Sequence, residues 1–500
     1  MRILCLGNNT EDTDTRTRVL AQTNSMECHG LLSELEHPIE FNQITEAGYY
    51  HSSVYDMEFG RLVDLAKRFD TIVILDQSKE QYTHPDAFYK TIRIARQLKK
   101  TQPVIFLNTS YEQDIDFFEN LVETNKSFCI FPFIELMTFN GNTTVCCQSR
   151  TPILPIKDLK NFATDPHYQT IRNKLIAGKP IPEHCSICYK LEAQNVISPR
   201  QQQTVEWANR LNLSSLDDLI KITKPAYYEV RASNVCNLQC RMCNPEDSSL
   251  IAREFKLLNL VTDYKKIEYS DFDIIEFDNL RKLYIAGGEP TAMPQFYNFL
   301  DRCITTNNID FELVINTNAV KISNKFRKQA RQFNNMQFII SIDGHDQINH
   351  YIRWPSNWNS LINNVQYLQK HHVISFNATV SIYNVTRLFD LLEFFDCNFP
   401  GILVHCQYAG SINGMLSPIR FPNAKLALER VLPIRLLKCY HNDPLLASTI
   451  EGLINHYEKE LDPDIIRLRQ FFEFNDKLDR SRNVKLVDYI PELEEYRKLL

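Results

Sequence analysis

The sequence predicts an α/β fold with a parallel sheet, and two observations lead to this prediction. Six short apolar segments between residues 227 and 406 are separated by stretches in which apolar residues recur at helical spacing. Strands that alternate with helices in this way pair in parallel, because each helix returns the chain to the same edge of the sheet. Several segments also end in polar residues, and barrel enzymes place their chemistry at the carboxyl ends of parallel strands.

The six expected strands follow one another along the chain. They cover residues 227–232, 283–286, 311–318, 337–344, 376–381 and 402–406. The helix expected after the second strand starts near Pro294 and buries a face formed by Phe296, Phe299, Leu300, Cys303 and Ile304. Another amphipathic helix is expected over residues 358–368.

Three cysteines in a C-x3-C-x2-C run lie on the loop after the first strand. They are Cys236, Cys240 and Cys243. Three thiolates on one loop can hold three irons of a 4Fe–4S cluster and leave the fourth iron open to a small molecule. A structural zinc site is the alternative, although zinc sites usually offer C-x2-C pairs that add up to four ligands. The spacing therefore favours iron–sulfur.

The second strand ends in the turn Gly287, Gly288, Glu289 and Pro290. Two glycines let a backbone edge approach a ligand closely. The carboxylate can accept hydrogen bonds from an ammonium group. Because this turn is expected at the same rim of the sheet as the cysteine loop, we interpret the two as parts of one site.

Together, the cysteine run and the Gly-Gly-Glu-Pro turn resemble the signature of the radical S-adenosylmethionine superfamily. The resemblance implies a partial (β/α)6 barrel over residues 225–410, with the three cysteines as ligands of a 4Fe–4S cluster. It also implies that the open iron binds S-adenosylmethionine, which the turn contacts. Reductive cleavage of this cofactor would yield a 5′-deoxyadenosyl radical that abstracts hydrogen from a substrate. Met242 is a departure, because relatives often carry an aromatic residue at this position.

Polar residues at the ends of the third and fourth strands are further candidates. Asn316, Asn318, Ser341 and Asp343 are expected to contact cofactor or substrate, and turn or cap chemistry is the open alternative. Arg353 matches an arginine that relatives with an auxiliary domain often carry after this strand. Its guanidinium can clamp a carboxylate, and a solvated surface arginine is the alternative.

A second cysteine system lies upstream and resembles the SPASM/Twitch auxiliary-cluster module. Such modules carry a Gly-x4-Cys turn and a closing C-x2-C. The resemblance implies that Cys129, Cys146, Cys185 and Cys188 ligate a second, auxiliary 4Fe–4S cluster. The order is a departure, because this module precedes the barrel here and follows it in most relatives. Two alternatives stay open: Cys147 can replace Cys146 as a ligand, and zinc can occupy the site, since zinc ribbons use the same C-x2-C step.

Composition narrows the functional classes. The formal net charge is −6 and no strongly basic block appears, so no nucleic-acid partner is indicated. No apolar run approaches the length needed to span a bilayer. The cysteines outside the two systems are scattered, as in proteins that keep their thiols reduced. We therefore expect a cytoplasmic enzyme without a membrane partner.

These patterns predict five regions. They are a small α/β accessory domain at 1–115, a Twitch-like module at 120–200, a connector helix at 201–224, the barrel at 225–410 and a helical C-terminal region at 411–500. The accessory domain is expected to contain a three-stranded parallel sheet. It lacks the G-x-G-x-x-G of a dinucleotide site. The C-terminal helices are expected to pack against the barrel.

The resemblance implies an enzyme that modifies a peptide or protein, or else a small molecule. It would receive electrons from a donor such as a flavodoxin or ferredoxin. Two other classes remain: a zinc-stabilised binding protein without catalysis, and an electron-transfer module whose iron–sulfur clusters only relay charge.

Overall fold

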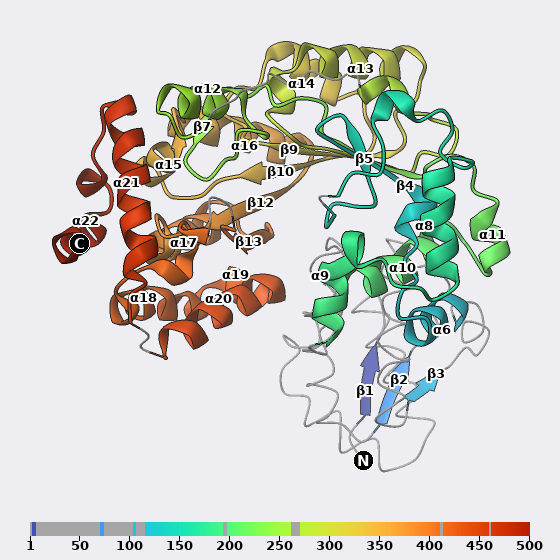
Figure 1. Ribbon diagram of the computed structural model, residues 1–500, viewed down its shortest axis with the longest axis horizontal. Helices are drawn as coiled ribbons and strands as arrows, with labels where there is room; N and C mark the ends of the chain where they lie inside the picture. Colours follow the sequence, from blue (N-terminus) through green and yellow to red (C-terminus); the bar gives the residue numbers. More distant parts are fainter. Residues whose placement is uncertain are drawn as a thin grey trace. The chain divides into compact units, whose positions relative to one another are not determined.

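Parallel pairing joins most of the strands in the structure, which is a computed structural model (Figure 1). It describes residues 3–6, 71–74, 104–106, 116–149, 151–193, 198–261, 271–410, 414–459 and 462–500. The chain divides into two units. Met1–Phe133 and Pro166–Thr223 form the N-terminal unit, and Ile134–Asp165 and Lys224–Leu500 form the sheet unit.

The sheet unit contains an eight-stranded sheet in the order β13-β12-β10-β9-β8-β6-β4-β5. Its strands are β4 (Glu135–Phe139), β5 (Asn142–Thr144), β6 (Tyr227–Val230), β8 (Lys282–Ile285), β9 (Glu312–Thr317), β10 (Met336–Ser341), β12 (Val373–Val380) and β13 (Val404–Tyr408). All neighbours pair in parallel except β4 and β5. The six predicted strands are present and lie side by side in chain order, as in a barrel wound in one direction. The predicted α/β fold class is confirmed.

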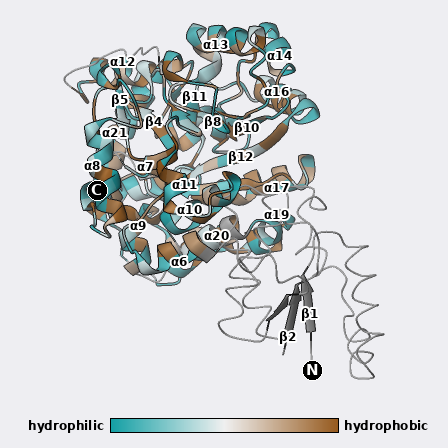
Figure 2. Ribbon diagram, turned by 90° about the vertical axis from the view of Figure 1, so that its right-hand side faces the viewer, coloured by the Kyte–Doolittle hydropathy of each residue, from teal (hydrophilic) through white to brown (hydrophobic). Residues whose placement is uncertain are grey.

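Helices connect these strands. They are α12 (Ser249–Leu257), α13 (Pro294–Thr305), α14 (Asn324–Ala330), α15 (Gln347–Ile352), α16 (Trp358–His371) and α17 (Leu388–Asn398). Helix α13 begins at Pro294 and buries Phe296, Phe299, Leu300 and Cys303, as its spacing predicts. Figure 2 shows hydrophobic and hydrophilic residues mixed along α13, α14 and α16, which is typical of helices that cover one side of a sheet.

The two faces of the sheet differ in chemistry because side chains alternate along each strand. One face packs on the helices: Phe338 of β10 lies against Phe326 of α14, and Phe376 of β12 stacks on Phe395 of α17 with 4.0 Å between ring centroids. The opposite face is polar and half-buried. Its members include Tyr284, Asn316, Ser341, Asn377 and His405.

Strands β4 and β5 extend the sheet beyond the predicted six. They come from residues that the sequence suggested for the auxiliary module. Asn140 and Gly141 both have positive φ, 51° and 73°, and join the two strands as a two-residue hairpin loop. Asn-Gly between apolar segments is a strong hairpin signal, so the sequence does contain the information for this element.

The C-terminal region is helical, as predicted. It contains α18 (Ala424–Val431), α19 (Lys438–Asn442), α20 (Pro444–Tyr457), α21 (Ile465–Arg482) and α22 (Pro491–Glu494). Helix α21 packs against α12, where Arg482 pairs with Glu254 at 2.6 Å and both side chains are buried. Phe474 and Phe255 meet edge to face at the same contact. This tail is therefore part of the sheet unit's core.

The N-terminal unit contains the predicted three-stranded parallel sheet, formed by β1 (Ile3–Leu6), β2 (Thr71–Ile74) and β3 (Val104–Phe106). Its helices within the described residues include α6 (Asp116–Thr124), α8 (Pro166–Ile176), α9 (Pro182–Ala193), α10 (Pro199–Arg210) and α11 (Leu216–Ile220). No helix in the described parts of either unit is long and apolar enough to cross a bilayer.

The connector helix expected at 201–224 is two helices in the structure, α10 and α11. Asn212 adopts a left-handed φ of 53° directly after α10. Ser215 then caps α11 by accepting a hydrogen bond from the Asp218 amide. A left-handed asparagine ends a helix and a serine starts the next one. The single helix was expected from the leucines at positions 211, 213, 216 and 219, and this expectation was wrong.

Candidate metal and cofactor site

The cysteine run lies on one loop between β6 and α12 in the sheet unit. All three thiols are partly exposed and none forms a disulfide. Burial, and then the neighbouring Cys240, raise the pKa of Cys236 to about 12. Burial and then Cys240 also raise the pKa of Cys243 well above its usual value, and Cys236 adds to this shift. The loop therefore brings the three thiols close enough to repel one another once they ionise.

Such thiols become thiolates when a cation is present to offset both burial and mutual repulsion. Thiolates are soft ligands that suit iron–sulfur clusters and zinc. Within the described ranges, no three His, Cys, Asp or Glu side chains gather closely enough to hold a single metal ion. The three sulfurs of the loop, each able to bind a different iron, fit a cluster that keeps one iron open.

The Gly-Gly-Glu-Pro turn after β8 contacts both ends of the cysteine loop. The Gly288 amide donates to the Asp247 carbonyl at 3.1 Å, and the Glu289 amide donates to the Val235 carbonyl at 2.8 Å. Gly288 has a φ of 50°, and a Cβ there would lie 2.2 Å from the Val235 carbonyl oxygen. The sequence suggested that this glycine admits a ligand, whereas its closest neighbour is the cysteine loop itself.

Glu289 is buried, and the chain supplies its hydrogen-bond donors. Oε1 accepts from the hydroxyls of Thr291 and Thr317, both at 2.7 Å, and Oε2 accepts from the Asn318 amide at 2.7 Å. Burial raises the pKa of Glu289, and these hydrogen bonds oppose the shift. Pro290 begins a short 3-10 helix that Glu289 caps. The carboxylate thus joins the turn to the end of β9, and a contact with the cofactor stays a prediction.

The polar candidates on β9 and β10 form a row across the sheet. The Ser341 hydroxyl donates to Asn316 Oδ1 at 3.0 Å, and Asn316 Nδ2 donates to the Tyr284 hydroxyl at 3.2 Å. Asn318 instead donates through Nδ2 to Asn237 Oδ1, at 2.8 Å, on the cysteine loop. Tyr284 was not among the sequence candidates, because a tyrosine inside an apolar strand resembles an ordinary core residue.

Asp343 and Arg353 form a buried ion pair. Arg353 Nε lies 2.5 Å from Asp343 Oδ2, and the two side chains are 13% and 0% exposed, so Arg353 is not a solvated surface arginine. Asp343 Oδ1 accepts from the Thr379 amide at 2.7 Å, and its backbone carbonyl accepts from Asn384 Nδ2 at 2.6 Å. The carboxylate is therefore fixed by β12 and the loop that follows it.

Arg353 also lies beside the cysteine loop. Strand β7 (Gln239–Cys240) pairs antiparallel with β11 (Arg353–Trp354), so that Arg353 stands directly opposite Cys240. Burial raises the pKa of Cys240, and Arg353 opposes this more strongly than Asp343 adds to it. Burial alone would lower the pKa of Arg353, but Asp343 and the thiols at positions 240 and 243 raise it above its usual value. A fixed positive charge thus faces the triad.

Arg241, between two of the cysteines, anchors the loop to helix α21. Its side chain is fully buried. Nη1 donates to Asn475 Oδ1 at 2.9 Å, and Nη2 donates to Asp479 Oδ1 at 2.6 Å. The guanidinium also stacks over Tyr351, 3.6 Å from the ring centroid. Sequence reasoning missed the role of Arg241, because its partners lie between 110 and 238 positions away.

Three of the four upstream cysteines belong to the N-terminal unit. Cys185 and Cys188 lie one turn apart on α9 and are buried. Burial, then Cys185 and less strongly Cys188, raise the pKa of the buried Cys129, so these three thiols are neighbours. Cys146 and Cys147 belong to the sheet unit, the first buried and the second exposed. The choice between them as a ligand stays a prediction.

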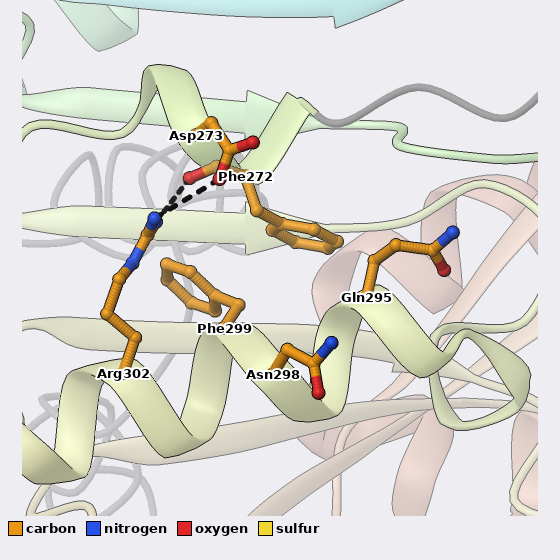
Figure 3. Close-up of a pocket in the computed structure, with 6 residues that line it drawn as sticks. All are labelled: Phe272, Asp273, Gln295, Asn298, Phe299 and Arg302. Carbon is orange, nitrogen blue, oxygen red and sulfur yellow. Dashed lines mark hydrogen bonds and ion pairs between the residues drawn. The ribbon is translucent and has the colours of Figure 1, made fainter.

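A cavity of about 300 Å³ opens beside α13 (Figure 3). It is lined by Phe272, Asp273, Gln295, Asn298, Phe299 and Arg302. Figure 3 shows Arg302 reaching toward Asp273, with an ion pair of 3.2 Å between them. None of the predicted site residues lines this cavity, so it is separate from the site on the cysteine loop.

No protein family profile and no curated protein matches this chain. Among solved structures, Streptococcus suis SuiB bound to S-adenosylmethionine is similar over 54% of this chain and 59% of its own, with 15% identity and a TM-score of 0.29. SuiB bound to precursor peptide SuiA matches over 50% and 59%, with 14% identity and a TM-score of 0.32. The protein anSMEcpe with bound AdoMet matches over 42% and 58%, with 15% identity and a TM-score of 0.31. The similarity thus spans less than two thirds of each of these chains.

Proposed function

We propose that this chain is a radical S-adenosylmethionine enzyme. Its sheet unit would hold a 4Fe–4S cluster on Cys236, Cys240 and Cys243. The observation that carries the proposal is the pair of backbone hydrogen bonds that join the Gly-Gly-Glu-Pro turn to both ends of the cysteine loop. These bonds support a single site at the carboxyl ends of parallel strands, where sheets of this kind bind ligands.

The residues around the loop fit such a group. Three thiols that repel one another when ionised call for a cationic core, and three thiolates are the ligand set of a cluster with one open iron. When bound, the cluster and S-adenosylmethionine supply a one-electron reductant and the source of a 5′-deoxyadenosyl radical for hydrogen abstraction. The chain's own part is to hold the loop rigidly through Arg241 and Asn318, and to offer Asn316 and Ser341 as polar contacts beside it.

An auxiliary 4Fe–4S cluster that includes Cys129, Cys185 and Cys188 as ligands is the second part of the proposal. Its support is that Cys129, Cys185 and Cys188 are buried and lie close to one another, whereas a cysteine that only fills space in a core needs no other thiol nearby. The fourth ligand, Cys146 or Cys147, rests on the sequence alone. Because modules of this kind often accompany peptide-modifying enzymes, we propose a peptide or protein substrate, and a flavodoxin or ferredoxin as electron donor.

Metal analysis after anaerobic reconstitution tests both sites. Two cubane clusters contain about eight irons per chain. We expect Cys236→Ala/Cys240→Ala/Cys243→Ala to fall to about four, and Cys185→Ala/Cys188→Ala to fall to about four independently, because each variant removes one set of ligands. Cys397→Ala is the control, since this exposed cysteine lies outside both sets and should leave the iron content unchanged.

The metal analysis, combined with a calorimetric titration of S-adenosylmethionine, separates the other functional classes. Stoichiometric zinc without iron in the wild type would favour a zinc-stabilised binding protein. Iron in both sites, with no heat of binding when S-adenosylmethionine is titrated into the protein, would favour an electron-transfer module. An unchanged iron content in the Cys185→Ala/Cys188→Ala variant would contradict only the proposal of an auxiliary cluster.

A further inference from the structure

We propose that the positive charge of Arg353, held in place by Asp343, raises the reduction potential of the cluster on the cysteine loop. The inference rests on the proposed function, because it concerns a cluster bound by the three cysteines. It assigns the ion pair a role that does not depend on the identity of the substrate.

Backbone geometry places the charge. Arg353 and Cys240 are direct partners in the antiparallel pair of β11 and β7. Side chains at directly opposite positions of an antiparallel pair point to the same side, with Cβ atoms about 4.5–5.5 Å apart. The Arg241 amide also donates to the Ile352 carbonyl at 2.8 Å, which holds the two segments in this register. The pairing of the two strands thus places the Arg353 side chain beside Cys240, a proposed cluster ligand.

The charge cannot move away, because its partner is immobile. Asp343 is fully buried and receives hydrogen bonds from the Thr379 amide and, at its carbonyl, from Asn384. The Asp343 amide donates to Asn349 Oδ1 at 3.0 Å. A charge fixed in a largely buried place is weakly screened by water and salt, so it acts on neighbouring groups more strongly than a surface charge does.

The sign of the effect follows from the electron count. Reduction adds one electron from a one-electron donor to the cluster and makes it one unit more negative, with no bond formed or broken. A nearby cation stabilises the more negative state, whereas Asp343 opposes this from the far side of the pair. Among the described residues, the other charges beside the triad are the acidic Asp247 and Glu289, and Arg482. Arg482 is paired with Glu254, as Arg353 is with Asp343, but it acts on Cys240 less strongly than Arg353 does. Arg353 is therefore the cation whose charge the triad experiences most.

The sequence suggested another role for Arg353, a clamp for a carboxylate of the ligand. The two roles can be separated by measuring the potential without S-adenosylmethionine. A clamp has nothing to bind under this condition and leaves the potential unchanged. An electrostatic role changes the potential whether or not the cofactor is present.

The experiment is a redox titration of the reconstituted full-length protein, followed by electron paramagnetic resonance. The triad cluster is recognised as the signal that changes when S-adenosylmethionine is added to a parallel sample. Arg353→Gln is expected to shift its potential to more negative values, and Arg353→Lys to keep it near the wild-type value. Asp343→Asn is expected to shift it in the opposite direction. Arg435→Gln, which removes the same charge from the exposed pair with Glu451, is the control and should cause no shift.

Iron content and thermal unfolding of each variant show whether the site has survived. If Arg353→Gln does not fold, Asp343→Asn still shows the direction in which the Asp343 charge shifts the potential. Comparing Asp343→Asn with the Arg353→Gln/Asp343→Asn double variant then shows the direction of the shift caused by Arg353. Equal potentials in folded, iron-loaded variants would overturn the inference, as would an Arg353→Lys variant that behaves like Arg353→Gln. A wild type that assembles no cluster on the triad would instead overturn the proposed function.

Discussion

Replacing Gly288 with alanine is expected to prevent assembly of the metal site. A Cβ at this position would lie 2.2 Å from the Val235 carbonyl oxygen and 2.9 Å from its carbon, which are backbone atoms that cannot rotate away. The left-handed φ of 50° adds about 1–2 kcal/mol for any residue with a side chain. Because Val235 immediately precedes Cys236, the clash must displace either the turn or the first cysteine. Iron content after reconstitution should fall by about four per chain.

A matched control separates the clash from the backbone strain. Gly401 also has a positive φ, 79°, but no atom lies within 4 Å of a Cβ built there. Gly401→Ala should therefore lower the free energy of unfolding by about 1–2 kcal/mol and leave the iron content at the wild-type level. A Gly288→Ala variant that binds iron as the wild type does would contradict the account of the turn as the support of the cysteine loop.

The Asp479→Ala substitution is expected to lower the free energy of unfolding by about 3–5 kcal/mol, because it leaves the buried guanidinium of Arg241 without its counter-charge. The ion pair measures 2.6 Å, and Arg241 is 0% exposed. Asp479 also accepts hydrogen bonds from the Tyr351 hydroxyl and the Leu486 amide, at 2.9 Å and 2.7 Å. Urea unfolding of the full chain measures the change.

An exposed pair provides the comparison for this prediction. Asp273 pairs with Arg302 at 3.2 Å, and its side chain is 73% exposed. Asp273→Ala should change the free energy of unfolding by less than about 1 kcal/mol, because water and salt screen such pairs. Similar losses for Asp479→Ala and Asp273→Ala would show that helix α21 does not brace the cysteine loop.

The parts of the fold that local patterns encode could be predicted. Apolar strands followed by helices predict the parallel sheet, and Pro294 begins a helix as expected. The hairpin of β4 and β5 was missed because Gly141, the glycine of the Gly-x4-Cys motif that ends at Cys146, was interpreted only as part of that motif. The break at Asn212 was missed because leucines recur on both sides of it. The helix ends there because a single residue, Asn212, adopts a left-handed backbone conformation.

The site shows the same division between local and distant information. The cysteine loop and the Gly-Gly-Glu-Pro turn follow successive strands, so their proximity could be expected from chain order. The partners of each side chain could not. Glu289 accepts hydrogen bonds from residues at the end of β9, and Arg241 donates hydrogen bonds to residues of α21. The sequence around either residue does not indicate these contacts. Long-range pairing depends on the packing of whole elements, which spacing rules do not describe.

Formation of 5′-deoxyadenosine is the direct measure of radical S-adenosylmethionine chemistry in this protein. The reconstituted wild-type protein is incubated anaerobically with S-adenosylmethionine and dithionite, and the products are separated by liquid chromatography. We expect 5′-deoxyadenosine from the wild type and none from Cys240→Ala, because the variant lacks a ligand of the cluster that supplies the electron. An iron-loaded wild type that forms no 5′-deoxyadenosine, or a Cys240→Ala variant that forms as much as the wild type, would contradict the proposed function.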